Sequence, residues 1–534
     1  MRVVLVMIVA GLLLAGCRNS GDGGQANTGS DLPAQDSLVP DSETGIPDSS
    51  GSDMSVDIGK DLGTEDLSDA LDGIHPDQSD GVDSDLVGPP ETATLDNWNQ
   101  VLEQGTEEGL EWFLDRYDGP FCESSTCLFI THVPDQVDVM IRGEFNDWEE
   151  VEMIPLDFAQ GFFYYFLEDA SFMSYAVYKL YAGDEWFRDS LNPYFRFSDV
   201  SVNSAVYKSG SSRLALVEGV YSSELDNSRN LYVYLPAAHF KDPLRKFPVM
   251  YMQDGFNVFD NPMAPFGSWN VNLIADELIA VGDIEPLIIV GIDTDDRINE
   301  YLYSEIILDN GNEYIFVEPK LDLYCDFLVN GILPLVAARW PVLSGREDTA
   351  MAGSSFGGIS SMYIAWTHAD VFGKVAALSS SFWIGESEGT QGHASLREII
   401  NTGILDPKQL SLRIYLDSGA VPEGDPMPNP YSFDGRVYSD WTRNALIKAG
   451  YPNRLEYDED GELETPPKDF PAETNPGLVP TLFWAAELPL QYSSWDEYLQ
   501  TQNSLLHVVG AGHYHNEAAW EARFPMVLRY LFGY

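Results

Sequence analysis

Cationic side chains are scarce in this chain of 534 residues, which carries 29 Lys and Arg against 85 Asp and Glu and a net charge of −56. A surface this acidic repels other polyanions. Nucleic acid, anionic lipid head groups and polyanionic substrates are therefore excluded as expected partners. Histidine is also rare, with eight residues in the whole chain, which leaves few candidates for a catalytic base that works near neutral pH.

Cysteine is nearly absent, with four residues. Cys122 and Cys127 lie close together in "FCESSTC", where no further zinc ligands are apparent, so in an exported protein they predict a local disulfide. Cys325 lies inside a helical apolar pattern and is predicted to be a buried, inert thiol. The fourth, Cys17, closes the N-terminal segment.

Long apolar runs are missing beyond the N-terminus, since no later stretch reaches the ~18 residues of a membrane-spanning helix. The start "MRVVLVMIVAGLLLAGC" has one Arg, an apolar run and small residues before Cys17, which is typical of a secretory signal. Its end, "LAGC", resembles the bacterial lipobox. The resemblance implies a signal peptide over residues 1–16, lipidation of Cys17 and anchoring in the bacterial cell envelope. An ordinary signal peptide is the alternative.

Residues 17–96 contain few apolar side chains. From Arg18 to Asp96 there are 19 acidic residues against two basic ones, among Ser and Gly. Such a segment cannot bury enough apolar surface to offset the entropy lost on ordering. It is predicted to be a disordered, self-repelling acidic tether.

Residues 97–210 read as short strands and turns, which predicts a small antiparallel β-sandwich. Its "GEFNDW" at 143–148 and "RDSLNPY" at 188–194 resemble the immunoglobulin-like modules that precede glycogen-branching enzymes and many secreted esterases. Some members of that family bind α-glucans, for which Trp148 and Trp186 are candidates. A place in the module's core is the alternative for both.

Residues 211–534 alternate short β-rich apolar runs with segments of helical length, including "FPVMYMQDG", "PLIIVGIDT" and "KVAALSSSF". This alternation predicts a mostly parallel sheet covered by helices on both faces. Ligands bind such sheets at the carboxyl ends of the strands.

The segment "GSSFG" at 353–357 fits the pattern G-x-S-x-G between a predicted strand and a predicted helix, as in a nucleophile elbow. Glycines flank the serine because a strained turn brings neighbouring backbone too close for side chains. Ser355 is therefore predicted to be a nucleophile. A tight turn without chemistry is the alternative.

A serine nucleophile needs a base, and in this type of fold the chain order is nucleophile, acid, base. Three histidines follow the predicted strand "LRIYLDSG", namely His507, His513 and His515. His507 lies in the apolar run "LLHVVG" and is expected to be buried in a strand. His513 and His515 both follow the last predicted strand, and a metal site on this pair is a further alternative.

The acid of the triad is expected close to the end of the strand before Gly419, where Asp417, Glu423 and Asp425 all qualify by position. An oxyanion hole needs two N–H groups. The amide of Phe356 follows the serine directly, and the amide of Phe256 follows Gly255 in "YMQDGF".

Several motifs in order are similar to the putative-esterase family, among them "FPVMYMQDGFNVFD", "VGIDTDDRINEY", "MAGSSFGGISSMYIAW" and "HNEAAW". The family includes enterochelin, feruloyl and acetylxylan esterases, formylglutathione hydrolases and mycolyltransferases. The resemblance implies an α/β-hydrolase fold with Ser355 as nucleophile and Phe256 as an oxyanion donor. It selects His515 through its spacing to Trp520, and it favours Glu423 as the acid over Asp417 and Asp425.

The same resemblance implies that four residues near the pocket bind substrate: Asp254, Arg297, Tyr301 and Trp383. The insertion at 456–495 departs from the family pattern. It is predicted to be a lid that uses Trp484, Tyr492 and Trp495, and a surface excursion is the alternative.

The sequence therefore predicts an exported, lipid-anchored serine carboxylic-ester hydrolase without metal or organic cofactor. Its substrate would be a small-molecule or carbohydrate-linked ester. The alternatives are a glycan-binding lipoprotein whose hydrolase domain is inactive, and an acyltransferase with the same triad.

Overall fold

The computed structural model describes residues 92–136, 138–309, 314–386, 394–402, 407–420, 434–451, 482–483, 485–499 and 504–534. The predicted signal peptide and nearly all of the predicted tether lie outside the described residues. So do Glu423, Asp425, Trp484 and most of the predicted lid. All described residues belong to one compact unit of the chain.

Two helices open the described part, where the sequence predicted only strands and turns. They are α2 (Leu95–Gln104) and α3 (Glu107–Leu114). Threonine side chains cap both N-termini, Thr94 by accepting from the amide of Asn97 and Thr106 by accepting from the amide of Gly109. Apolar residues three apart then give each helix one buried face, including Trp98 and Val101 of α2.

Two antiparallel sheets follow, in agreement with the predicted all-β region. One has the order β1 (Phe121–Glu123), β2 (Thr126–His132), β6 (Phe162–Leu167), β5 (Ile154–Pro155). The other has the order β4 (Val151–Glu152), β3 (Met140–Gly143), β7 (Tyr175–Ala182), β10 (Val202–Tyr207), β9 (Phe195–Phe197), with β8 (Glu185–Phe187) paired to β7. A disulfide between Cys122 and Cys127 joins β1 to β2.

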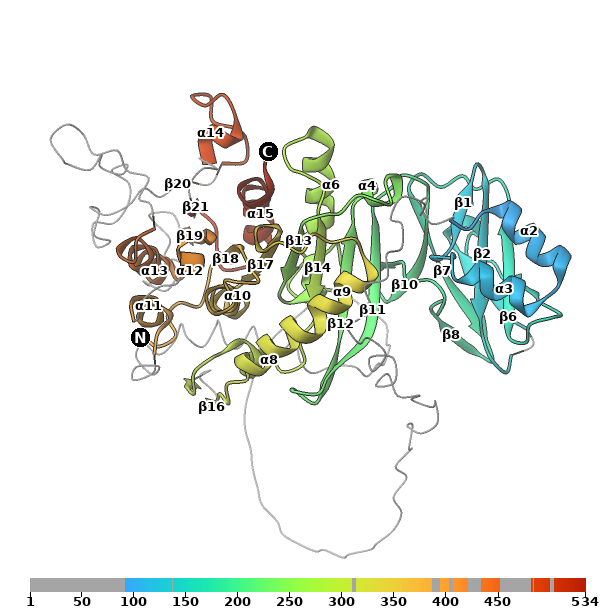
Figure 1. The fold of residues 1–534 in the computed structure, drawn as a ribbon, viewed down its shortest axis with the longest axis horizontal. Coiled ribbons are helices and arrows are strands. Elements are labelled where there is room, and N and C mark those ends of the chain that lie inside the picture. The colour runs from blue at the N-terminus through green and yellow to red at the C-terminus, as the bar shows by residue number, and fades with distance from the viewer. Residues whose placement is uncertain are drawn as a thin grey trace, which may run out of the picture. The chain divides into compact units, whose positions relative to one another are not determined.

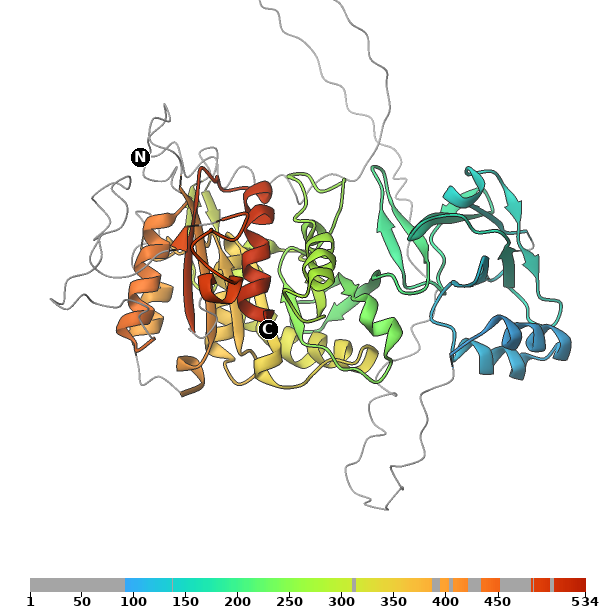
Figure 2. The same ribbon diagram turned by 90° about the horizontal axis from the view of Figure 1, so that it is seen from above.

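A nine-stranded sheet forms the second region (Figures 1 and 2). Its order is β11 (Arg213–Ser222), β12 (Asn227–Leu235), β14 (Ile288–Ile292), β13 (Val249–Met252), β17 (Thr349–Ser354), β18 (Lys374–Leu378), β19 (Arg413–Ala420), β21 (Leu505–Ala511), β20 (Leu482–Phe483). The pairings of β11 with β12 and of β12 with β14 are antiparallel, and all others are parallel. The first strand of this sheet begins five residues after β10 ends, close to the predicted boundary.

Helices cover both faces of this sheet, as Figure 1 shows. Alternate residues of β13 separate the two cores, because Val249 and Tyr251 face one apolar cluster while Met250 and Met252 face the other. Around the first cluster lie α8 (Leu321–Phe327), a π-helical segment (Leu328–Ile332), α9 (Leu333–Arg339), α10 (Phe356–Thr367), α11 (Leu396–Asn401) and α13 (Arg436–Lys448). Around the second lie α6 (Val271–Val281), α14 (Trp495–Leu499) and α15 (Glu517–Phe532).

Short elements complete the description: α4 (Ala237–Lys241), α5 (Gly255–Val258), α7 (Arg297–Tyr301), α12 (Pro407–Leu410) and the hairpin of β15 (Ile307–Asp309) and β16 (Tyr314–Phe316). Among the described residues, one helical stretch, Leu321–Arg339, is long and apolar enough to cross a membrane by length and composition. It supplies Tyr324, Leu328 and Val336 to the buried core beside the sheet, which is the behaviour of a core helix.

The described end of the predicted lid packs on α14 and α15. Tyr492 and Trp495 pack on Tyr498, with ring centroids 5.0 and 5.9 Å away. The guanidinium of Arg529 lies 4.1 Å from the Trp495 ring. Because Arg529 is near the far end of α15, about 18 Å of helix separates it from the end that faces the serine. Trp495 therefore packs against the far half of α15, and Tyr492 packs on α14.

Candidate active site

Ser355 lies at the point where β17 ends and α10 begins. Its backbone has φ 56° and ψ −122°, a strained conformation for a residue with a side chain. A Cβ atom on Gly353 would lie 2.5 Å from the carbonyl oxygen of Gly357, and one on Gly357 would lie 3.0 Å from the Cβ of Gln253. The flanking glycines are thus required by the close approach of backbone, as the sequence pattern predicted.

The serine is held from both sides. Its amide donates to the carbonyl of Leu378 at 3.1 Å, and its carbonyl accepts from the amide of Ser381 at 3.0 Å. The two hydroxyl oxygens of Ser355 and Ser381 are 3.4 Å apart. These bonds fix the strained turn on the adjacent strand β18.

The two predicted oxyanion donors both lie in the first turn of a helix. Phe356 is the first residue of α10, and Phe256 is the second residue of α5. Amides in the first turn of a helix have no acceptor within that helix and are available to an anionic oxygen. A Cβ atom on Gly255 would lie 2.6 Å from the carbonyl carbon of Gly291, so the loop that carries Phe256 rests directly on β14.

The end of the N-terminal region supports that loop. The Phe197 ring of β9 lies edge-on to the Phe256 ring at 5.7 Å, and Tyr232 contacts both rings. The next residue back along β9, Arg196, forms an ion pair with Asp260, four residues beyond Phe256. These contacts hold one side of the predicted oxyanion hole.

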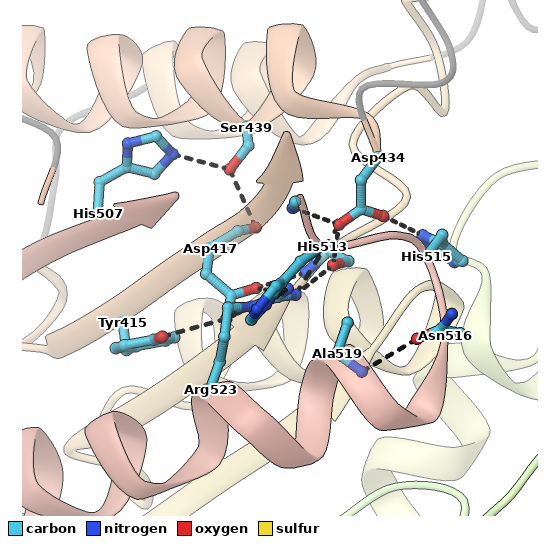
Figure 3. A network of polar contacts seen from close by, with 12 residues as sticks. Tyr415, Asp417, Asp434, Ser439, His507, His513, His515, Asn516, Ala519 and Arg523 are labelled. Carbon is cyan, nitrogen blue, oxygen red and sulfur yellow. Dashed lines mark hydrogen bonds and ion pairs between the residues drawn. The ribbon is translucent and has the colours of Figure 1, made fainter. Parts of the chain in front are cut away.

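His515 lies in the loop between β21 and α15, and its Nδ1 is 2.5 Å from Oδ1 of Asp434 (Figure 3). The carboxylate is buried, while the imidazole side chain is 22% exposed. Among the described residues, Nε2 of His515 has no hydrogen-bond partner. A carboxylate on one nitrogen and a free second nitrogen are what a general base requires.

Asp434 was not among the predicted acids. It stands directly before Gly435, the residue that precedes α13, and its second oxygen accepts from the amide of Gly419 at 2.5 Å and from the hydroxyl of Ser379. Burial alone would raise the pKa of Asp434. The charge and hydrogen bond of His515, together with Arg523 and Ser379, outweigh burial and lower this pKa below its ordinary value.

Asp417, a predicted alternative for the acid, takes another place. Figure 3 shows it against Arg523, whose Nε and Nη2 donate to its two oxygens at 2.8 and 3.1 Å. Arg523 is fully buried on α15 and also donates to the Ser379 hydroxyl at 2.7 Å. Asp417 is therefore the partner of a buried arginine and does not contact His515. Neither Arg523 nor its role was predicted.

The other two histidines that follow the strand before Gly419 take different places. His513 lies 3.2 Å through Nδ1 from Nη1 of Arg523, and burial, with the charge of Arg523, lowers its pKa to about 4. His507 is buried in β21 beside Ser439 and Arg443, and burial lowers its pKa well below the usual value. The predicted burial of His507 is confirmed.

The alternative of a metal site on His513 and His515 lacks a ligand set. Their side chains face Arg523 and Asp434 respectively. Within the described part of the chain, no group of three His, Cys, Asp or Glu side chains is arranged to hold a metal ion.

A pocket of about 490 Å³ lies beside the serine and is bordered by Ser354, Phe256 and Trp520. Asp254 and Arg297, two of the predicted substrate-binding residues, line it and form a double ion pair at 2.6 and 2.8 Å. Its position at the carboxyl ends of β13, β14 and β17 is where parallel sheets bind ligands.

The other two predicted substrate-binding residues do not line this pocket. Tyr301 is fully buried, and its hydroxyl accepts from the amide of Asp254 at 3.0 Å. Trp383 is 7% exposed and packs 6.0 Å from the Phe356 ring. For both, the prediction of substrate contact is replaced by a supporting position behind the loop and the helix that carry the site.

The family comparison agrees with this geometry. A family model described as "Putative esterase" matches residues 222–430. These residues are therefore similar to that esterase family. The matched segment contains Ser355 and both predicted oxyanion donors and stops short of His515. The match indicates an α/β-hydrolase-like domain in this part of the chain.

Individual relatives are distant or short. The uncharacterized protein YbbA of Bacillus subtilis is 25% identical over 34% of this chain and 68% of its own length. The iron(III) enterobactin esterase of Escherichia coli K12 is 35% identical over 16% of this chain and 21% of its own length. A solved ferulic acid esterase from Anaeromyces mucronatus is 17% identical, covering 60% of this chain and 90% of its own, with a TM-score of 0.38. The chain thus spans about a fifth of the enterobactin esterase.

Proposed function

We propose that the protein hydrolyses small-molecule carboxylic esters with Ser355, His515 and Asp434 as its catalytic triad. The observation that carries the proposal is the combination of a strained serine at the G-x-S-x-G turn with a histidine whose Nδ1 is held by a buried carboxylate. The similarity of residues 222–430 to the esterase family supports it.

In the first half of the reaction, Oγ of Ser355 attacks the carbonyl carbon of the ester. Nε2 of His515 takes the hydroxyl proton as the new C–O bond forms, and then gives that proton to the departing alcohol oxygen. The products are an acyl-serine and a free alcohol. In the second half, water attacks the acyl carbon, His515 takes a water proton and returns it to Oγ, and the carboxylic acid leaves.

Asp434 has two tasks in this scheme. Its Oδ1 accepts from Nδ1 of His515, which leaves Nε2 without a proton and able to act as the base, and its charge stabilises the imidazolium that forms in each step. Because Asp434 is itself held by Gly419 and Ser379, the imidazole cannot rotate without breaking a buried network.

The amides of Phe256 and Phe356 stabilise the negative oxygen of each tetrahedral intermediate. A donor of this kind contributes about 3 kcal/mol to lowering the barrier. The ion pair between Asp254 and Arg297 and the bond from the Asp254 amide to Tyr301 keep the Phe256 loop in place.

Hydrolysis of p-nitrophenyl acetate and butyrate by the full chain tests the proposal. Ser355→Ala and His515→Ala are expected to lower kcat by about 10⁴-fold or more, and a fluorophosphonate is expected to label the wild type but not Ser355→Ala. Absence of both turnover and labelling in the wild type would instead favour a glycan-binding protein with an inactive hydrolase domain.

We also propose that the chain is exported and lipidated at Cys17, on the strength of the N-terminal apolar run and "LAGC". Metabolic labelling with a radioactive fatty acid, compared between the wild type and Cys17→Ser, tests this. Equal labelling of the two proteins would leave an ordinary signal peptide as the better reading.

A further inference from the structure

The pocket beside the serine has an unusual concentration of negative charge. Five carboxylates line it: Asp254, Asp293, Asp295, Asp296 and Glu517. Two of the five are already neutralised by described cations. Arg297 forms the double ion pair with Asp254, and Lys320 lies 2.9 Å from Oδ2 of Asp296. Asp293, Asp295 and Glu517 remain.

Glu517 is the deepest of these three. Only 8% of its surface is exposed, although it lines the pocket from the first position of α15. No hydrogen bond or ion pair joins its carboxylate to the side chain of another residue that the structure describes. The backbone amide of Glu517 itself donates to this carboxylate. A buried carboxylate with so little compensation is costly, so a group that lines a pocket in this state is placed to meet a ligand.

Burial and neighbouring charge act on this carboxylate together. Burial, with a contribution from Asp254, raises the pKa of Glu517 to about 7. His515 from the same loop and Arg297 from α7 oppose this rise without cancelling it. Burial likewise raises the pKa of Asp293 to about 6. Both carboxylates would gain from a positive charge in the pocket.

Aromatic rings form much of the rest of the wall. Trp269 and Trp520 both line the pocket with their ring centroids 5.5 Å apart, and Phe256 and Phe266 line it as well. Indole and phenyl rings beside carboxylates are the surroundings in which proteins bind quaternary ammonium groups. Arg297 donates to Asp254 through Nε and Nη2, and its buried Nη1 has no hydrogen-bond partner among the described residues. An anionic substrate would still meet repulsion, because the lining has five carboxylates and one arginine.

We propose that this pocket binds the positively charged ammonium group of an ester substrate, through the carboxylates of Glu517, Asp293 and Asp295 and the rings of Trp269 and Trp520. The inference deepens the proposed function and rests on it for the position of the scissile ester next to Ser355. The net charge of −56 supports it, because a strongly negative protein attracts cationic substrates.

A pair of matched thioesters tests the inference. Acetylthiocholine and S-(3,3-dimethylbutyl) thioacetate have the same shape and differ by the positive charge. We expect kcat/KM at pH 8 to be at least tenfold higher for the charged ester in the wild type. Glu517→Gln is expected to lower that ratio at least fivefold. Glu277→Gln, which changes an exposed carboxylate on α6, is the matched control and is expected to keep the ratio.

The same ratio should rise between pH 6 and pH 8, because the pKa of Glu517 is about 7 and its carboxylate becomes charged across this interval. A ratio of one or below in the wild type would overturn the inference, and equal or better turnover of neutral sugar acetates would identify a polyol pocket instead.

Binding without turnover separates this inference from the proposed function. Choline and 3,3-dimethylbutanol are titrated into Ser355→Ala while tryptophan fluorescence is followed, since Trp269 and Trp520 line the pocket. Choline is expected to bind at least tenfold more tightly than the neutral alcohol, and five-fold more weakly after the added change Glu517→Gln. Equal affinities for the two alcohols would overturn the inference even in an active esterase. If the wild type binds choline selectively but is inactive, the ammonium-binding pocket is supported and only the proposed ester hydrolysis is refuted.

Discussion

The charge state of each carboxylate in the site depends on the groups that contact it directly. Asp434 stays ionised because it meets an imidazole, a hydroxyl and a backbone amide, which outweigh its burial. Glu517 is also buried, and there burial outweighs the hydrogen bond from its own backbone amide and the charges of His515 and Arg297, so its pKa rises instead of falling. Two buried carboxylates near one histidine are thereby suited to different tasks.

The identity of the triad acid gives the first prediction. Asp434→Asn should lower kcat on p-nitrophenyl acetate by about 10⁴-fold, because an amide favours the wrong imidazole tautomer and carries no charge. Glu423→Gln and Asp425→Asn, which change the acids favoured by sequence position, should stay within about threefold of the wild type. Steady-state kinetics on the three variants, with circular dichroism to establish folding, decides between them. Loss of activity in Glu423→Gln with retention in Asp434→Asn would reverse the assignment.

The raised pKa of Glu517 gives a prediction for stability. In the unfolded chain this carboxyl has a pKa of 4.5, whereas in the folded chain it is about 7. Between these values the folded state binds the extra proton, so the contribution of Glu517 to stability is present below pH 4.5 and is lost as the pH rises to 7. The loss amounts to about 3 kcal/mol.

Thermal unfolding of the wild type and Glu517→Gln at pH 5 and pH 8 measures this effect. The Tm difference should move in favour of Glu517→Gln on going from pH 5 to pH 8, since glutamine does not ionise. Glu277→Gln should show no such change, because that side chain is exposed. A Tm difference independent of pH would show that Glu517 is not destabilised by ionisation.

At the scale of elements, the site is assembled at the ends of strands and the starts of helices. Ser355 follows β17, His515 follows β21, Asp434 precedes α13 and Phe256 lies in α5. Arg523 links these elements. From the middle of α15 its guanidinium donates to Asp417 on β19 and to Ser379 just past β18. A helix packed against two neighbouring strands thus fixes the loop that carries the histidine.

Strand β9 is predicted to act on the oxyanion loop from outside the esterase sheet. Phe197→Ala removes the ring that packs against Phe256, so the amide of Phe256 should become less well positioned. We expect kcat on p-nitrophenyl acetate to fall by about tenfold with KM little changed. The fall is smaller than for complete removal of an oxyanion donor, because the Phe256 amide is displaced but still present.

The control for this change is Trp186→Ala on β8, which removes a ring that is 44% exposed and distant in sequence from the loop. It should leave the esterase kinetics unchanged. Phe197→Leu, which retains part of the contact, should give an intermediate kcat. A rise in KM alone in Phe197→Ala would instead indicate that β9 contributes to substrate binding.

At the scale of the whole molecule, charge is the dominant property. The predicted tether accounts for 19 of the 85 acidic residues, so most of the negative charge belongs to the folded regions. Like charges crowded on a compact body oppose folding, and dissolved salt screens them.

Added salt is therefore expected to stabilise the protein. Raising NaCl from 20 mM to 500 mM should raise the Tm by several degrees, since the Debye length shrinks from about 20 Å to about 4 Å. Differential scanning calorimetry on the full chain measures the change, and an uncharged osmolyte of equal osmolality is the control. A Tm that is unchanged or lower in salt would show that favourable ion pairs outweigh the repulsion.

The sequence could predict the features that depend on neighbours along the chain. The turn at Ser355 requires glycines within two residues, the amide of Phe356 follows the serine, and alternating apolar patterns separate the sheet from its helices. The two antiparallel sheets before the esterase domain follow from the same alternation. The helices at 95–114 were missed, although their capping threonines and buried residues three apart were legible.

What only the tertiary structure decided are the contacts between residues far apart in sequence. His515 is 81 positions from Asp434, and Arg523 is 106 positions from Asp417. Three carboxylates were candidates because they lie close to Gly419 in the sequence. The register of β19 with β21 and the packing of α13 instead place a fourth one, Asp434, against the histidine. The burial of Glu517 likewise could not be predicted from "HNEAAW", because burial depends on how distant segments pack.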